Sequence, residues 1–288
     1  MPRQLMGEFS RTGMCMARRN LHSTLWLRAA AINFALVLAG CCVWADAYCD
    51  PTAELDDLAA RLQYAFHTAD ERRLKEVLEL LRKLDIPDAL TGLKEYYSAY
   101  GEWKLLELYV EESAGARTQT AIRTAAYKAA QSCVRHSENA SKAAPGLAEV
   151  NAIQAVCAAF FPGHRPGDPL VFRSCERSKV LQAAHLLDPA NPRVMLMEAL
   201  CLRGNGAAAA GAQFDKLRDA IAAFELAPPA LGARPDWGQA EALVLLGQCY
   251  LERGDTLAAR DAIERALVLA PDYRKAQELL QAAATRPR

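Results

Sequence analysis

One six-residue pattern, Ala-x-x-Leu-x-Pro, occurs three times, as Ala184-His-Leu-Leu-Asp-Pro189, Ala223-Phe-Glu-Leu-Ala-Pro228 and Ala266-Leu-Val-Leu-Ala-Pro271. The three prolines lie 39 and 43 residues apart. Proline lacks a backbone donor and clashes with the preceding helical turn, so each copy predicts the end of a helix. The spacing therefore predicts a repeated unit of about forty residues, which is the length of one helical hairpin.

The composition of the whole chain favours helices as well. The 288 residues include 56 Ala and 39 Leu but only 12 Val and 6 Ile, a balance that favours helix over strand. Hydrophobic residues make up 52% and charged residues 24%, so the chain can bury a core. We therefore expect an all-α fold and exclude a β-sandwich or a β-barrel.

The first half of the mature chain also shows helical signals. Asp50-Pro51 supplies an N-cap and a proline at the first helical position, and apolar residues then recur near the helical period from Leu55 to Phe66. The same patterns predict further helices over residues 70–84, 89–112, 118–137 and 145–161.

The last repeated unit carries a family resemblance. Its marker residues are Leu243, Leu246, Gly247, Tyr250, Gly254, Asp255, Ala259, Ile263, Ala266 and Pro271. This pattern closely resembles the tetratricopeptide repeat (TPR), a helical hairpin of about 34 residues. Gly247 and Ala259 let two antiparallel helices approach, Gly254 permits the turn, and Tyr250 fills the gap between units. The nine extra residues of the last spacing fit Pro229 to Asp236, between two units. The resemblance implies an α-solenoid of antiparallel helical hairpins, a TPR-like superhelix.

The N-terminus is typical of an export signal. Residues 1–40 hold five Arg, no Lys and one acid, and they end in an apolar run of about twelve residues, too short to span a bilayer. Leu38-Ala39-Gly40-Cys41 resembles the lipobox of bacterial lipoproteins, in which the cysteine is lipidated. Cleavage after Ala47 is the alternative. We expect an export signal over 1–40, a degenerate helical-hairpin region over 50–170, and TPR repeats with a C-terminal capping helix over 171–288.

The resemblance also implies a binding surface. TPR proteins bind partners mostly through the concave surface formed by the first helix of each hairpin. Carried over by the motif, that surface consists here of Arg193, Leu196, Leu200, Arg203, Glu241, Val244, Gln248 and Glu252. This lining suits a peptide segment or a helix. The resemblance therefore implies a non-enzymatic adaptor of the bacterial cell envelope, whose partner is another envelope protein or a peptide segment of one.

An alternative function comes from an aromatic cluster. Tyr96, Tyr100 and Trp103 fall on one helical face, where they form either solenoid core or the wall of a cavity for a peptide or a small apolar ligand. The second possibility would fit a solute-binding protein that resembles the TPR lipoproteins of TRAP-type uptake systems. A cavity lined by Tyr100 and Trp103 would favour it, and a packed core with an open groove would favour the adaptor.

The sequence gives no support for an enzyme, a metal-binding protein or a nucleic-acid-binding protein. The sequence contains no GxSxG, GxGxxG, Walker or HExxH motif, and its five histidines are scattered, so we expect no enzyme and no cofactor. Cys133 and His136 lack a second closely spaced pair, so we expect no metal site. Beyond residue 40 the net charge is about −4 without a basic stripe, which argues against a nucleic-acid partner. Membrane contact is expected only through a lipid on Cys41.

The cysteines predict one disulfide. Export would place them in an oxidising compartment. Cys157 closes one expected helix and Cys175 opens the next around a loop rich in Pro and Gly, so a bridge between these two is expected. Cys201 and Cys249 occupy equivalent places in adjacent repeats, and we expect both to be free thiols in the core.

Overall fold

The computed structural model describes residues 50–113, 119–160, 172–202 and 206–285. The export signal over 1–40, the lipidation of Cys41, cleavage after Ala47 and the side chain of Arg203 lie outside these residues. Residues 49–288 form one compact unit.

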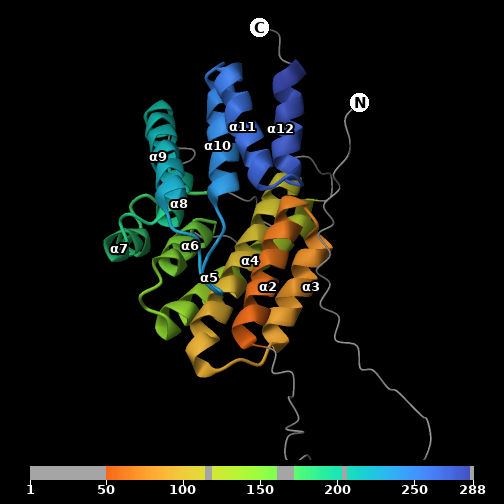
Figure 1. The fold of residues 1–288 in the computed structure, drawn as a ribbon, viewed down its shortest axis with the longest axis vertical. Coiled ribbons are helices and arrows are strands. Elements are labelled where there is room, and N and C mark those ends of the chain that lie inside the picture. The colour runs from red at the N-terminus through yellow and green to blue at the C-terminus, as the bar shows by residue number, and fades with distance from the viewer. Residues whose placement is uncertain (1–49, 114–118, 161–171, 203–205, 286–288) are drawn as a thin grey trace, which may run out of the picture. The chain divides into compact units, whose positions relative to one another are not determined.

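The described part of the chain folds into eleven α-helices and one short 3-10 turn (Figure 1). The elements are α2 (Pro51–His67), α3 (Glu71–Lys83), η1 (Asp88–Leu90), α4 (Thr91–Ser113), α5 (Gln119–Ala143), α6 (Ala148–Ala158), α7 (Lys179–Leu187), α8 (Pro192–Cys201), α9 (Ala207–Leu226), α10 (Gln239–Glu252), α11 (Thr256–Leu269) and α12 (Arg274–Thr285). The same residues form no β-strand. The expectation of an all-α fold is confirmed.

The helices pack mainly against their neighbours in the sequence. The pairs α2–α3, α4–α5, α6–α7, α8–α9 and α10–α11 are in contact, and α12 packs against α11. This arrangement is that of a helical-hairpin array.

The sequence signals for helix ends are confirmed. The helices α7, α9 and α11 end at Leu187, Leu226 and Leu269, each two residues before the proline of its Ala-x-x-Leu-x-Pro copy. At the other end of the chain, the Asp50 side chain accepts a hydrogen bond of 3.0 Å from the Thr52 backbone and caps α2. The Asp70 side chain caps α3 in the same way.

The hairpin of α10 and α11 has the close contacts that its small residues predict. A Cβ atom on Gly247 would lie 2.7 Å from the Ile263 side chain, so only glycine lets these helices approach so closely. Gly254 adopts a left-handed φ of 80° at the turn. The ring of Tyr250 meets the ring of Phe214 from the preceding hairpin at a centroid distance of 5.1 Å. Gly247, Gly254 and Tyr250 therefore have the local roles that were expected of them.

Gly247 provides a test of this packing. We expect Gly247→Ala to lower the free energy of unfolding by about 1–3 kcal/mol, because the added methyl group meets Ile263 and the Ala259 carbonyl. The matched control is Gly211→Ala in α9, where a Cβ atom meets nothing within 4 Å. This control should gain up to about 1 kcal/mol, since alanine favours a helix. Urea denaturation of both variants measures the difference, and equal effects would contradict the close approach.

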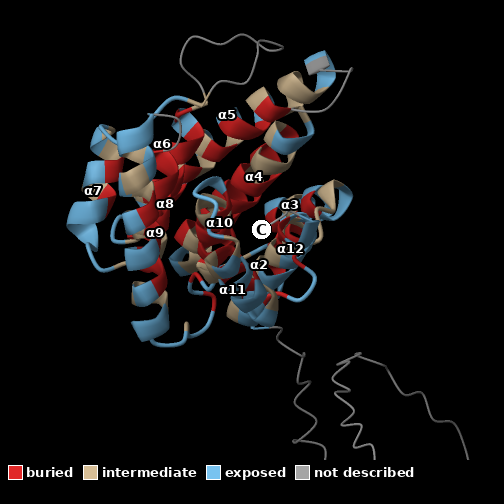
Figure 2. Cartoon of the chain, turned by 90° about the horizontal axis from the view of Figure 1, so that it is seen from above, coloured by how far each residue is buried: buried red, intermediate tan, exposed pale blue. Residues whose placement is uncertain are grey.

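The core centres on α4, which contributes buried residues along much of its length (Figure 2). Its aromatic residues meet Trp237, which lies just before α10. The Trp237 ring centroid is 4.9 Å from that of Tyr100 and 5.4 Å from that of Trp103. The Trp237 indole also donates a hydrogen bond of 2.5 Å to the Tyr96 hydroxyl. The two halves of the sequence therefore share one core.

The disulfides differ from the expected pairing. Cys133 on α5 is bonded to Cys157 on α6, and Cys175 is bonded to Cys201 at the end of α8. The predicted bridge between Cys157 and Cys175 is therefore wrong, and so is the expectation of a free thiol at Cys201. The physical reason is that packing of α5 on α6 brings Cys133 within a Cα distance of 6.2 Å of Cys157. Cys249 takes part in neither disulfide.

Candidate functional site

Most of the surface that the TPR resemblance assigns to a partner is buried. Leu196, Leu200, Glu241 and Val244 are all 6% exposed or less. The helices that carry these residues pack against several others, α8 against α6, α7 and α9, and α10 against α9, α11 and α12. The prediction that these four residues form an open concave surface is therefore wrong.

Three of the remaining predicted residues do border open space. Gln248 and Glu252 line a small cavity of about 280 Å³ between α9 and α10, and Glu252 is exposed. Arg193 lines a separate and larger groove, which is described below. The structure therefore does not bring the predicted residues together in one site.

The aromatic cluster belongs to the core. Tyr96, Tyr100 and Trp103 are at most 1% exposed, and none of them lines a cavity described for residues 50–285. Their partners are one another and Trp237. The prediction that they line a ligand cavity is not supported, and their burial favours the alternative interpretation as core.

A buried charge cluster joins α4 to α10. We define it as Lys104, Glu107, Glu241 and His67. The Lys104 ammonium is 2.9 Å from Glu107 Oε2 and 3.7 Å from Glu241 Oε1, and the His67 imidazole is 3.6 Å from the same Glu241 oxygen. Lys104 is only 1% exposed. A buried charge needs partners of this kind, so the cluster fixes α4 against the face of α10.

Aromatic rings complete the surroundings of Lys104. Its Nζ atom lies 3.7 Å from the Trp103 ring centroid and 4.0 Å from that of Phe66. Such cation–π contacts stabilise an ammonium that has lost its water. Sequence reasoning missed this cluster. The available signal was a lysine within the aromatic stretch of α4, but nothing in the sequence pointed to Glu241 as its partner.

The cluster makes the stability of the fold depend on pH. Burial raises the pKa of Glu241, but the Lys104 ammonium and His67 lower it further, from the usual 4.5 to about 2. A group with a depressed folded-state pKa contributes stability above its unfolded pKa and loses it as the pH falls through the folded pKa. We therefore expect a loss on the order of 3 kcal/mol between about pH 5 and pH 2. Denaturation of the wild type and of Glu241→Gln across this range measures it, and parallel curves would contradict the shift.

The largest cavity described in the structure is a groove of about 860 Å³, which we call the linker groove. Three segments line it: residues 144–149, residues 188–193, and the connection between α9 and α10 with its flanking residues, 224–239; Leu93 of α4 adds to them. The segments come from both halves of the sequence, so only the folded chain forms the groove. Its lining combines apolar and aromatic side chains with a few charged groups, as ligand sites do.

The connection between α9 and α10, which forms one wall of the linker groove, is held by hydrogen bonds to α4. The Tyr97 hydroxyl donates a hydrogen bond of 2.9 Å to the Ala233 carbonyl, and Trp237 donates to Tyr96. Ala233 and Trp237 are 2% and 3% exposed. The extra residues expected between two TPR units are therefore packed onto α4, and the groove has a preformed wall.

Charged groups in the linker groove differ in how well they are paired. The Asn191 amide donates to the Glu149 carboxylate at 3.0 Å and to the Asp188 carboxylate at 3.1 Å. Arg193 lies beside two rings, with its guanidinium carbon 5.5 Å from the Phe224 centroid and 5.9 Å from the Trp237 centroid. Its Nε atom is buried without a hydrogen-bond partner. Within the described residues, no carboxylate forms an ion pair with Arg193.

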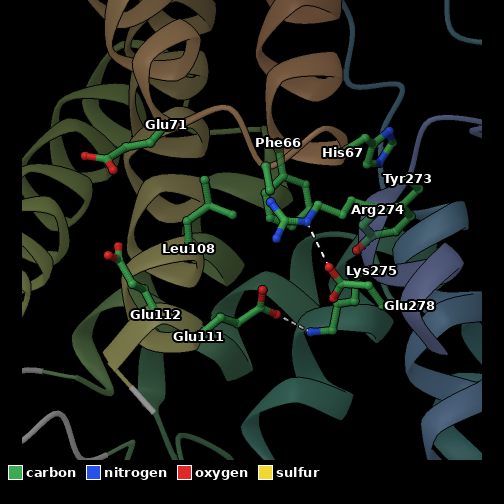
Figure 3. Close-up of a pocket in the computed structure, with 11 residues that line it drawn as sticks. Phe66, His67, Glu71, Leu108, Glu111, Glu112, Tyr273, Arg274, Lys275 and Glu278 are labelled. Carbon is green, nitrogen blue, oxygen red and sulfur yellow. Dashed lines mark hydrogen bonds and ion pairs between the residues drawn. The ribbon is translucent and has the colours of Figure 1, made fainter. Parts of the chain in front are cut away.

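A second cavity, of about 410 Å³, lies among residues of α2, α3, α4 and α12 (Figure 3). Its charges are paired with one another: Lys275 with Glu111, and Arg274 with Glu278 at 2.8 Å. Glu71 accepts hydrogen bonds from Lys75 and from the Tyr109 hydroxyl. These pairs leave no free cation among the lining residues of this cavity, although the buried His67 Nε2 atom, which also lines it, has no hydrogen-bond partner.

Among the described helices, none is long and apolar enough to cross a bilayer. The described residues also contain no cluster of three or more His, Cys, Asp or Glu that could hold a metal ion. No protein-family model matches the chain, and no curated protein matches it.

Proposed function

We propose that this protein is a non-enzymatic, TPR-like adaptor of the bacterial cell envelope that binds a segment of another protein in the linker groove. The observation that carries the proposal is the groove itself, which is open, has a fixed wall and contains an unpaired arginine. A groove of this size with apolar walls suits an extended peptide segment.

Two features support a TPR-like fold and export to the cell envelope. The hairpin pairs and the marker residues of α10 and α11 support a TPR-like solenoid, in which the stability of each hairpin comes from its neighbours. The two disulfides support export, because such bonds persist in oxidising compartments. Anchoring through Cys41 and release after cleavage at Ala47 remain the two alternatives for the mature protein.

The alternative function, solute binding, has less support. It would need a cavity or channel lined by the aromatic residues of α4, and Tyr100 and Trp103 are packed in the core instead. The linker groove borders exposed residues such as Leu231, which is 80% exposed, so it is more accessible than the enclosed site expected for a small solute.

Site-specific photocrosslinking in the native host tests the adaptor. A photoreactive phenylalanine derivative replaces Leu231 in the groove or, as a matched control, Leu257 on α11, which is 78% exposed. We expect a discrete adduct with an envelope protein from position 231 and none from position 257. Identical adducts from both positions, or none from position 231, would contradict the proposal.

A further inference from the structure

The unpaired guanidinium of Arg193 indicates what the linker groove binds. Its Nε atom is buried without a hydrogen-bond partner, and burial of an unsatisfied donor costs free energy. Arg193 also lines the linker groove, so a ligand bound there can offer its guanidinium group a partner. Because the donor is charged, the acceptor that gains most is an anion.

Other groups that line the groove do not fill this role. The carboxylates of Glu149 and Asp188 share the Asn191 amide and form no ion pair with Arg193. Arg234 and Asp236 are both exposed and together add no net charge. The positive charge of Arg193 therefore stands without a direct counterion from the described residues of the groove.

The surroundings of Arg193 favour a carboxylate over other anions. The guanidinium carbon lies 5.5 Å from the Phe224 ring centroid and 5.9 Å from that of Trp237, and rings this close restrict how its planar fork can turn. A carboxylate matches that fork with two parallel hydrogen bonds. The lining of the groove also includes the apolar residues Pro228, Pro229 and Leu231.

We infer that Arg193 binds a carboxylate carried by an apolar, extended segment of the partner protein. This inference rests on the proposed adaptor function and gives it a chemical class of ligand. The carboxylate belongs to the C-terminus of the segment or to an acidic side chain within it. A free carboxylic acid has the same chemistry, so the experiment includes a small acid as a separate arm.

The experiment begins with a selection. Random twelve-residue peptides with free C-termini are displayed and selected on the folded, disulfide-bonded protein. Selected peptides are then synthesised in two forms, one with every carboxylate and one with amides in their place. Their affinities are measured for the wild type, Arg193→Gln, Arg193→Lys and the charge-matched control Arg218→Gln, an exposed arginine on α9 that does not line the groove.

The inference predicts a specific pattern of affinities. Amidation should weaken binding to the wild type roughly tenfold to a hundredfold, the range expected for a charge-assisted hydrogen bond. The Arg193→Gln variant should bind the carboxylate form of the peptide more weakly than the wild type does, by a similar factor. Its affinities for the carboxylate and amide forms should be nearly equal. The affinity of Arg193→Lys for the carboxylate form should lie between those of the wild type and Arg193→Gln, because lysine keeps the positive charge but lacks the planar fork of N–H donors. Arg218→Gln should behave as the wild type. Comparison of the two peptides on the wild type needs no variant to fold.

The remaining outcomes separate the inference from the proposed function. Peptides that bind equally well as amides, or equally well to Arg193→Gln, would overturn the carboxylate inference and leave the adaptor in place. A selection that yields no binding peptide would overturn both. Binding of 3-phenylpropionate as tight as that of the peptides, and equally dependent on Arg193, would overturn the protein segment in favour of a small carboxylic acid.

Discussion

Replacing Lys104 with methionine is expected to lower the free energy of unfolding by about 3–5 kcal/mol, the usual cost of removing one partner from a buried ion pair. Methionine keeps most of the volume but removes the ammonium that faces Glu241 and Glu107. The Glu241 carboxylate then remains almost fully buried without the ammonium that lies 3.7 Å from it. Urea denaturation at neutral pH measures the loss.

Two further variants make the Lys104 result specific. Lys75→Met removes a lysine whose pair with Glu71 is about half exposed, so it should cost at most about 1 kcal/mol. The double variant of Lys104→Met with Glu241→Gln should be more stable than the single variant, because no unpaired charge stays buried. Equal small losses for Lys104→Met and Lys75→Met would contradict the buried charge cluster.

Loss of the two disulfides is the second large effect. The bonded residues are 24 and 26 positions apart in the sequence, and closing loops of that length stabilises a fold by about 3–4 kcal/mol each in the chain-entropy model. Replacing Cys133 and Cys157 by alanine, or Cys175 and Cys201, should lower the free energy of unfolding by that amount. Denaturation with and without a reducing agent measures both contributions.

The pairing itself can be tested directly. Peptide mapping of the oxidised protein should recover Cys133 linked to Cys157, and Cys175 linked to Cys201. The variant with all four alanines should show no response of its stability to a reducing agent, whereas Cys249→Ala, which keeps both disulfides, should respond as the wild type does. A peptide that links Cys157 to Cys175 would contradict the structure and restore the expectation drawn from the sequence.

Local signals predicted the helices well. The proline of each Ala-x-x-Leu-x-Pro copy lies two residues beyond a helix end, and Asp50 caps α2. Gly247 makes the close contact that its place in the TPR pattern implies. Each of these features depends on residues near one another in the sequence or on a motif with a fixed geometry, so one sequence suffices to predict it.

The site could not be predicted in the same way. Lys104 and Glu241 meet across 137 positions, and no periodicity or spacing links them. Leu196 and Val244 are buried as well, because α8 packs on α6 and α9 while α10 packs on α9, α11 and α12. The residues from Pro229 to Asp236 appeared to be an insertion, yet the hydrogen bonds from Tyr97 and Trp237 show that the connection is packed onto α4. The TPR resemblance therefore predicted the helices, but not which residues elsewhere in the chain bury their surfaces.

The central claim is that Val244, on the face that the TPR resemblance assigns to a partner, is buried in the folded chain, whereas the linker groove is open. Thiol labelling tests it most directly, with Val244→Cys and Leu231→Cys placed separately in a background without reducing agent, in which Cys249 and the cysteines at positions 15, 41, 42 and 49 are replaced by alanine. Val244 is 1% exposed and Leu231 is 80% exposed. We predict that the thiol at position 244 reacts with a maleimide roughly a hundredfold more slowly than the thiol at position 231, and equally fast once the protein is denatured. Equal rates in the folded protein would contradict the account.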